Sequence, residues 1–161
     1  MELAYKLNDQ ISAPSAETSN DLAILWNVIN IYQYSSNLSN RLLGKYDLPL
    51  TQFILLSLFM ANVEEGRTVT NISHVLPQNQ PTISKIVQKL LKKGYLASYP
   101  TTHDARSKIL KITPAGQDIY HEAIMILEKN FGPIFNQWPS EELDDLIEKL
   151  KVMRSYLEAK A

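Results

Sequence analysis

The feature that most restricts the fold is a basic amphipathic segment followed directly by two strand-like runs. Residues 80–93 have apolar side chains at helical spacing on one side, namely Ile83, Ile86, Val87, Leu90 and Leu91, and polar or basic side chains on the other. Gly94 is a suitable C-cap for this helix. The runs 95–99 and 108–112 are rich in aromatic or β-branched residues. We therefore expect a helix with one polar face, followed by a two-stranded hairpin whose loop includes residues 100–106.

Three further helices are predicted before this segment. Good N-cap residues at positions 19 and 20 precede a helix that runs to about Leu43, and Gly44 is expected to end it as a C-cap. A second helix opens at residues 48–51 and should be central, because it is hydrophobic on nearly all sides. A short third helix follows residues 68–70.

Two more helices are predicted after the hairpin. Thr113 is an N-cap residue followed by a first-turn proline, so a helix begins there. Ser140 is expected to cap a last amphipathic helix, which carries the apolar stripe Leu143, Leu146, Ile147, Leu150, Met153 and Leu157. The resulting order is four helices, two strands and two helices, a mainly α fold with one small β-hairpin.

The third and fourth helices form a helix-turn-helix, with the turn at residues 77–80 and Pro81 as the first helical residue of the fourth. In such a motif the second helix enters the major groove of DNA, and a hairpin that follows it is a wing. Residues 85–111 hold seven Lys/Arg and one acidic residue, although the whole chain has a net charge of −1. Local positive charge of this kind is typical of a phosphate-binding surface, although a solvated lysine-rich helix face has the same composition.

The composition argues against several other functions. The absence of cysteine excludes disulfides, a thiol nucleophile, Cys-ligated zinc and control by thiol oxidation. His74, His103 and His121 lack the spacing of metal ligands, and no phosphate-binding glycine loop or hydrolase motif is present. We therefore expect no metal, no cofactor and no enzyme. The longest apolar run, residues 53–61, is too short for a membrane span of about 20 residues, and nothing at the start marks export, so a cytoplasmic location is expected.

Several short motifs resemble those of the MarR (multiple antibiotic resistance regulator) family. They are Leu50-Thr51-Gln52-Phe53, Thr70-Asn71-Ile72, Gln80-Pro81-Thr82-Ile83-Ser84-Lys85 and the stretch from Gly94 to Gly116. The most specific part is the Asp104-x-Arg106 wing followed by the helix start Thr113-x-x-Gly116. The resemblance extends from about Ser19 to Leu157, almost the whole chain.

The resemblance implies a winged helix-turn-helix protein whose long N- and C-terminal helices intertwine in a homodimer. The expected parts are a loose arm (1–18), a helical dimerisation region (19–46 with 114–161) and a winged domain (47–113). Asp104 would shape the wing, and Arg106 would reach the minor groove. The exposed apolar residues of the last helix, and those at positions 131–138 before it, also predict a homodimer, because a small domain rarely exposes so much apolar surface.

The expected function is sequence-specific binding of double-stranded DNA by a transcriptional regulator, favoured as a repressor of a palindromic operator. The predicted contacts are Thr70, Gln80, Thr82, Ser84, Lys85, Gln88, Lys89, Lys92, Asp104, Arg106 and Lys108. Lys93 is also expected to face phosphate. Glutamine pairs with adenine and a threonine methyl packs on thymine, so the operator should be rich in A·T pairs. A winged-helix module that binds protein instead of DNA remains the alternative.

A small aromatic effector is a further expectation. The resemblance allows Trp26, Tyr32, Tyr34 and Tyr46 to line a pocket for an aromatic or phenolic acid between the helical base and the winged domain. Aromatic residues on a helix stripe also serve as core, so the pattern is compatible with both roles. Binding of such an acid would release the protein from DNA.

Overall fold

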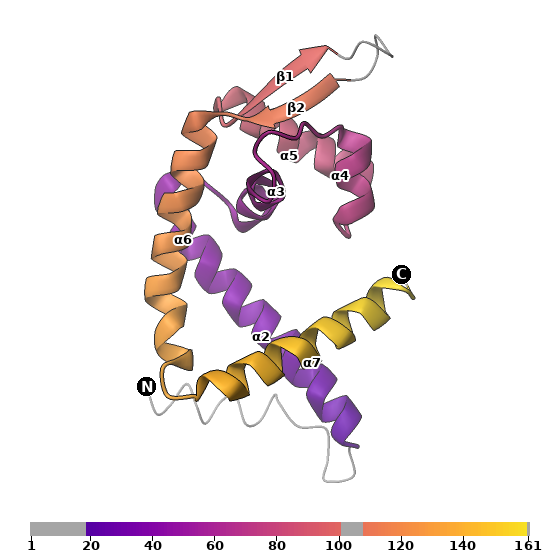
Figure 1. Ribbon diagram of the computed structural model, residues 1–161, viewed down its shortest axis with the longest axis vertical. Helices are drawn as coiled ribbons and strands as arrows, with labels where there is room; N and C mark the ends of the chain where they lie inside the picture. Colours follow the sequence, from indigo (N-terminus) through magenta and orange to yellow (C-terminus); the bar gives the residue numbers. More distant parts are fainter. Residues whose placement is uncertain (1–18, 101–107, 161) are drawn as a thin grey trace.

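The computed structural model describes residues 19–100 and 108–160, and its elements follow the predicted order (Figure 1). The helices are α2 (Asn20–Leu43), the 3-10 turn η1 (Gly44–Tyr46), α3 (Leu50–Met60), α4 (Val69–Val75), α5 (Gln80–Lys92), α6 (Pro114–Phe135) and α7 (Ser140–Glu158). Strand β1 (Leu96–Pro100) pairs antiparallel with β2 (Lys108–Ile112), with Leu96 opposite Ile112. The mainly α fold with one hairpin is confirmed.

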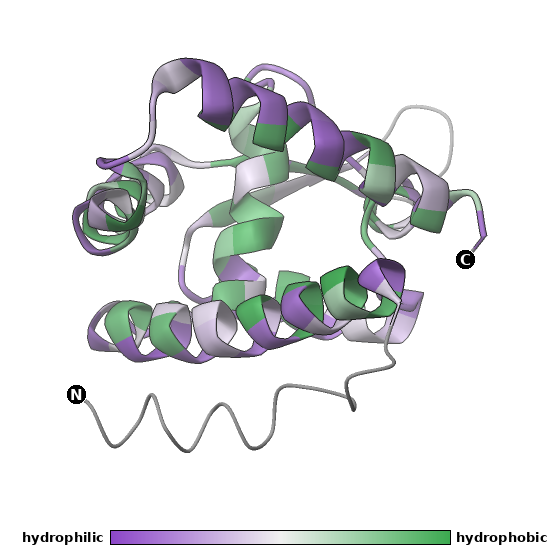
Figure 2. Cartoon of the chain, turned by 90° about the horizontal axis from the view of Figure 1, so that it is seen from below, coloured by the Kyte–Doolittle hydropathy of each residue, from purple (hydrophilic) through white to green (hydrophobic). Residues whose placement is uncertain are grey.

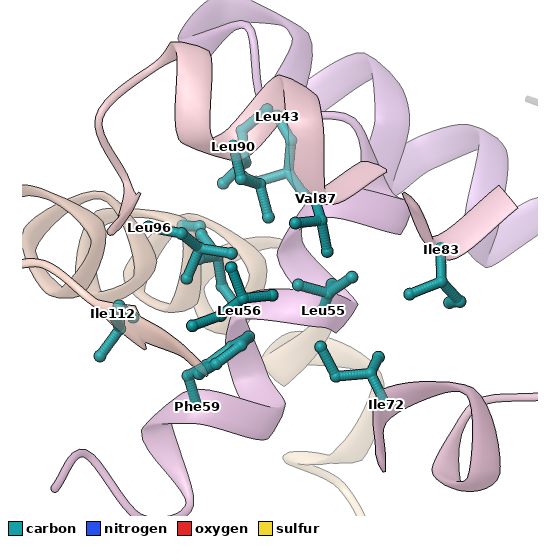
Figure 3. Packing of buried hydrophobic residues seen from close by; sticks show 13 residues of the cluster. Leu43, Leu55, Leu56, Phe59, Ile72, Ile83, Val87, Leu90, Leu96 and Ile112 are labelled. Carbon is teal, nitrogen blue, oxygen red and sulfur yellow. The ribbon is translucent and has the colours of Figure 1, made fainter. Parts of the chain in front are cut away.

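The hydrophobic core lies between α3, α5 and the hairpin (Figure 3). Leu55, Leu56 and Phe59 of α3 are fully buried, which confirms that this helix is central. They are joined by Leu43, Ile72, Ile83, Val87, Leu90, Leu96 and Ile112. Helix α6 covers α3 on one side, where the rings of Phe53 and Tyr120 stack with centroids 5.2 Å apart. This core holds α5 and the hairpin in a fixed relative position.

Helices α2, α6 and α7 extend away from the core as long arms (Figure 1). Helices α2 and α7 cross in Figure 1, but Figure 2, turned by 90°, shows them at different depths with α6 seen end-on beside them. No described residue of α7 is buried. Large apolar side chains of the arms, such as Ile31 and Leu150, are 65% and 47% exposed in the single chain.

The predicted end of α2 is confirmed, because Gly44 is its C-cap. The φ of Gly44 is −59°, which is right-handed, so the chain continues into η1. The left-handed residue is Asp47, with φ 49°, whose N–H bonds to the carbonyl of Gly44. Aspartate is one of the few side chains that tolerate this conformation. The turn therefore lies three residues later than the glycine suggests.

One predicted cap and one boundary differ. Ser19 is the N-cap of α2 as predicted, although its side chain makes no capping hydrogen bond. Ser140 is the first residue of α7, whose N-cap is Pro139. The helix α5 begins at Gln80, so Pro81 is its second residue. The cap of α6 is confirmed, because Thr113 Oγ1 accepts a 3.0 Å hydrogen bond from the Gly116 N–H.

Two expectations lie outside the described residues, namely the loose arm 1–18 and the wing loop 101–107. Within residues 19–100 and 108–160, none of the helices combines the length and the hydrophobicity that a membrane span requires.

Candidate nucleic-acid interface

Helix α4 is fixed at its start by a capping box. Thr68 Oγ1 accepts a 3.1 Å hydrogen bond from the Asn71 N–H, and Asn71 Oδ1 accepts bonds from the N–H and the hydroxyl of Thr68. Such reciprocal bonds satisfy donors that a helix start leaves free. Thr70, in the first turn of α4, is exposed. The capping box therefore holds a predicted DNA contact at a defined position.

The start of α5 is fixed by a residue that the sequence analysis placed only in the turn. Asn79 Oδ1 accepts a 3.0 Å hydrogen bond from the Thr82 N–H, so Asn79 is the N-cap. The sequence contained a signal for this cap, because asparagine is a favoured N-cap residue and proline is favoured in the first turn of a helix. Gln80 and Thr82 are exposed beside this cap, at the positive end of the helix dipole.

Helix α5 has one buried and one solvent-facing side, as predicted. Ile83 and Leu90 are fully buried and Val87 is 4% exposed. The exposed residues of the other side are Thr82, Lys85, Gln88, Lys89 and Lys92, while Ser84 is half-buried. The thirteen residues of α5 include no Asp or Glu. This side is therefore polar along its whole length and positively charged from Lys85 to Lys92.

The end of α5 joins it rigidly to the hairpin. The N–H of Tyr95 bonds to the carbonyl of Leu90 and the N–H of Gly94 to that of Leu91, and Gly94 has a φ of 73°. This is a Schellman motif, which confirms Gly94 as the predicted end of the helix. Tyr95 belongs to this cap, which explains why β1 begins one residue later than predicted.

A third backbone segment pairs with the hairpin, and it was not predicted from the sequence. The N–H of Arg67 donates to the carbonyl of Leu110 at 2.9 Å, and the N–H of Leu110 donates back at 2.8 Å. Gly66 allows this approach, because a Cβ there would lie 1.9 Å from Ile109 Cγ2. The segment before α4 is therefore hydrogen-bonded to β2. A single bridge leaves no periodic pattern in the sequence.

A pocket of about 310 Å³ lies between α4, α5 and the hairpin. It brings together three predicted DNA contacts from three elements, namely Thr70, Gln80 and Lys108. The remaining lining residues are Thr68, Val69, Val87, Leu91, Ser98 and Leu110. The hollow connects the start of the polar α5 side to the root of the wing, so the two form one continuous surface.

Other predicted site residues lie elsewhere. Asp104 and Arg106 are outside the described residues. Lys93 is on the basic helix, but its ammonium contacts Asp47 and Gln52 instead of facing outward. Among the described residues, no group of three acidic or histidine side chains is placed to hold a metal ion.

The four aromatic residues considered for an effector do not line this pocket. Tyr46 is half-buried against the core, whereas Trp26, Tyr32 and Tyr34 are 38%, 67% and 55% exposed on α2. At 3.6 residues per turn these three side chains leave α2 in different directions. A single protomer therefore does not gather them into one site.

The sequence of the winged region matches a known family. Residues 46–107 match the model of the MarR family. YdcH, an uncharacterized HTH-type transcriptional regulator of Bacillus subtilis (strain 168), is 28% identical over 108 residues, which cover 66% of this chain and 71% of YdcH. The winged region of this chain is therefore similar to the MarR family. The observed order of helices and hairpin is that of a winged helix-turn-helix fold, and the relative YdcH is named as a regulator of transcription.

Solved structures share this MarR-family fold over most of their length. The Staphylococcus aureus MepR–DNA complex matches with a TM-score of 0.73 at 22% identity, covering 86% of this chain and 99% of MepR. Staphylococcus aureus MarR in complex with salicylate and kanamycin matches with a TM-score of 0.77 at 20% identity, covering 88% and 94%. At these identities the likeness concerns the fold.

Proposed function

We propose that this protein is a homodimeric regulator, favoured as a repressor, that binds a palindromic A·T-rich operator. The recognition helix α5 enters the major groove and the hairpin wing contacts the minor groove. The observation that supports this most strongly is the solvent-facing side of α5, which is polar, positively charged and free of acidic residues. The same arrangement of helix and wing occurs in the fold of MepR, whose complex contains DNA.

The base contacts belong to the first three turns of α5. Gln80, Thr82 and Gln88 are exposed and suited to A·T pairs, because glutamine bonds to adenine N6 and N7 and a threonine methyl packs on the thymine methyl. Lys85 is the guanine contact, since α5 contains no arginine. Ser84 is half-buried and reaches less far. Phosphates bind the basic and hydroxyl groups on either side, which are Thr70, Lys89, Lys92 and Lys108.

The experiment is a selection of bound DNA fragments, followed by titrations of variants over a range of salt concentrations. Thr82→Ala and Gln88→Ala should relax the preference at particular base pairs by roughly 1–3 kcal/mol. Lys92→Ala is the matched phosphate variant, and it should weaken all sequences equally while reducing the salt slope by about one. A consensus dominated by G·C pairs would contradict the base assignment. Binding to heparin and DNA without salt dependence would contradict the function itself.

A second copy of the chain is proposed as the cover for α2 and α7. Helix α7 has 19 residues, none of them buried, and Ile147, Leu150 and Leu157 are 48%, 47% and 50% exposed on one side. Monomeric proteins rarely leave a continuous apolar stripe in water. A two-fold axis through these arms would place two α5 helices at half-sites one DNA turn apart, about 10–10.5 base pairs.

Light scattering at micromolar concentration tests the dimer. Leu150→Glu should produce monomers, because it places a charge in the apolar contact at a cost of several kcal/mol. Ser155→Glu adds the same charge to the same helix at an exposed polar position, and it should leave the dimer intact. A monomeric parent protein would refute both the dimer and the palindrome.

Release by a small aromatic acid is proposed for regulation. The support is the salicylate complex of the similarly folded Staphylococcus aureus MarR, together with aromatic side chains on α2 that the single chain leaves exposed. In the dimer, the site would be formed by those of Trp26, Tyr32, Tyr34 and Tyr46 that face the space between the helical base and the winged domain. Salicylate and related acids should raise the melting temperature and weaken operator binding. A panel that changes neither would remove this proposal.

A further inference from the structure

We propose that Lys93 is a positioning residue, which fixes the direction of the recognition helix α5 relative to the arm α2. Its ammonium has three acceptors on a segment 41–46 residues away in the sequence. They are the backbone carbonyl of Asp47, the Asp47 carboxylate at 2.9 Å and Gln52 Oε1 at 3.0 Å. Two of these contacts are hydrogen bonds from the ammonium group, and the contact with the carboxylate is an ion pair. We call this group the Lys93 clamp.

The clamp joins two tightly bonded turns. On one side, Lys93 is the C-cap of α5, next to the left-handed Gly94. On the other side, Asp47 is the left-handed residue between η1 and α3, and Gln52 is only 3% exposed in the first turn of α3. Bringing these turns together therefore connects the end of the recognition helix to the end of α2.

The turn between α2 and α3 is itself held by several hydrogen bonds. The Leu48 N–H bonds to the Leu43 carbonyl at 3.2 Å, and the Leu50 N–H bonds to Asn40 Oδ1 at 2.9 Å. Leu43 and Leu48 are both fully buried. A change in the direction of α2 therefore moves Asp47 with it, and the clamp transfers that movement to α5.

Apolar packing alone does not fix this geometry. The core residues of α5 are held by hydrophobic contacts, which have little directional preference. Two hydrogen bonds from a charged ammonium group, together with an ion pair, have stronger distance and angle requirements. The clamp consequently sets the angle at which each protomer presents α5. In a dimer on DNA this angle decides which separation of half-sites fits both helices, so the inference rests on the proposed function.

The neighbouring lysine provides a matched control. Lys92 is exposed on the solvent-facing side of α5, whereas the side chain of Lys93 is 21% exposed and engaged in the clamp. Lys92→Met and Lys93→Met therefore remove the same charge one residue apart. Only the second substitution breaks the connection to α2.

The test measures binding to operators that share half-sites but differ by one base pair in their separation. One base pair changes the spacing by about 3.4 Å and the rotation by about 35°. The parent should prefer one separation by about tenfold or more. Lys93→Met should reduce this preference to about threefold or less with an unchanged salt slope, and Lys92→Met should keep the preference and lose about one unit of salt slope. Lys93→Met behaving like Lys92→Met would overturn the proposal.

Two further measurements keep the test decisive. If Lys93→Met unfolds, Gln52→Met removes a buried acceptor while keeping side-chain length, and it should also weaken the preference for one separation; an unchanged preference would count against the clamp. Amide hydrogen exchange needs no DNA. Exchange at Leu48 and Tyr95 should accelerate in Lys93→Met and not in Lys92→Met, and equal rates would overturn the clamp. A parent that binds no DNA would instead refute only the proposed function.

Discussion

The two glycines that follow helices, Gly44 and Gly94, provide a direct test of the backbone. Gly94 has a φ of 73° at the end of α5, whereas Gly44 has a φ of −59° at the end of α2. A Cβ at either position meets no heavy atom within 4 Å. Steric clashes with neighbours are therefore absent, and the backbone conformation alone determines the sign of a Gly→Ala substitution.

The magnitudes follow from this difference. An L-residue in the left-handed region costs roughly 1–2 kcal/mol, which is partly offset by about 0.4–1 kcal/mol from the smaller entropy of the unfolded chain. Gly94→Ala should therefore lower the free energy of unfolding by about 1 kcal/mol. Gly44→Ala has only the entropic effect and should raise that free energy by about 0.4–1 kcal/mol.

Urea unfolding followed by circular dichroism measures both changes. The variants must be compared at one protomer concentration, because the proposed dimer would have a stability that depends on concentration. In thermal scans the expected shifts are about 2–4 °C per kcal/mol, in opposite directions. If Gly44→Ala destabilises the protein as much as Gly94→Ala, this would refute the right-handed conformation of Gly44 and with it the turn at Asp47.

Two other substitutions probe the packing and the wing. Gly116→Ala would place a Cβ 2.2 Å from the Tyr95 carbonyl oxygen and 2.8 Å from Ile112 Cγ1, so we expect a loss of about 3 kcal/mol in a thermal unfolding assay. An unchanged melting temperature would contradict the close contact of α6 with the hairpin. Arg106→Ala should weaken operator binding by roughly 1–3 kcal/mol without changing the melting temperature. Parent-like affinity in a titration would mean that the wing loop does not read the groove.

Local patterns predicted the fold well. The periodicity of α5, the cap at Thr113 and the strand Lys108–Ile112 were all predicted from neighbouring residues, and the structure has them at those positions. Such features depend on contacts within a few positions along the chain, where spacing and residue type are informative. The buried and exposed sides of α5 were predictable for the same reason.

Long-range contacts were not predictable in this way. The bridge between Arg67 and Leu110 joins residues more than forty positions apart and leaves no repeating pattern. Lys93 looked like the other lysines of the basic helix, because the sequence does not reveal that Asp47 and Gln52 lie beside it. The residue type indicated a charge at this position, whereas its partner depended on the tertiary fold.

The exposed residues of α5 and the residues that fix its two ends differ in what their substitution would change. Thr82, Lys85 and Gln88 are exposed, and their side chains make no hydrogen bond or ion pair with the described residues. Substitutions there should change stability by less than about 0.5 kcal/mol, because surface positions without partners contribute little to folding. The two ends of the helix are fixed separately, by the Asn79 cap and by the Gly94 turn with its clamp. If α5 reads bases as proposed, the preferred bases can therefore change while the direction of this helix is preserved.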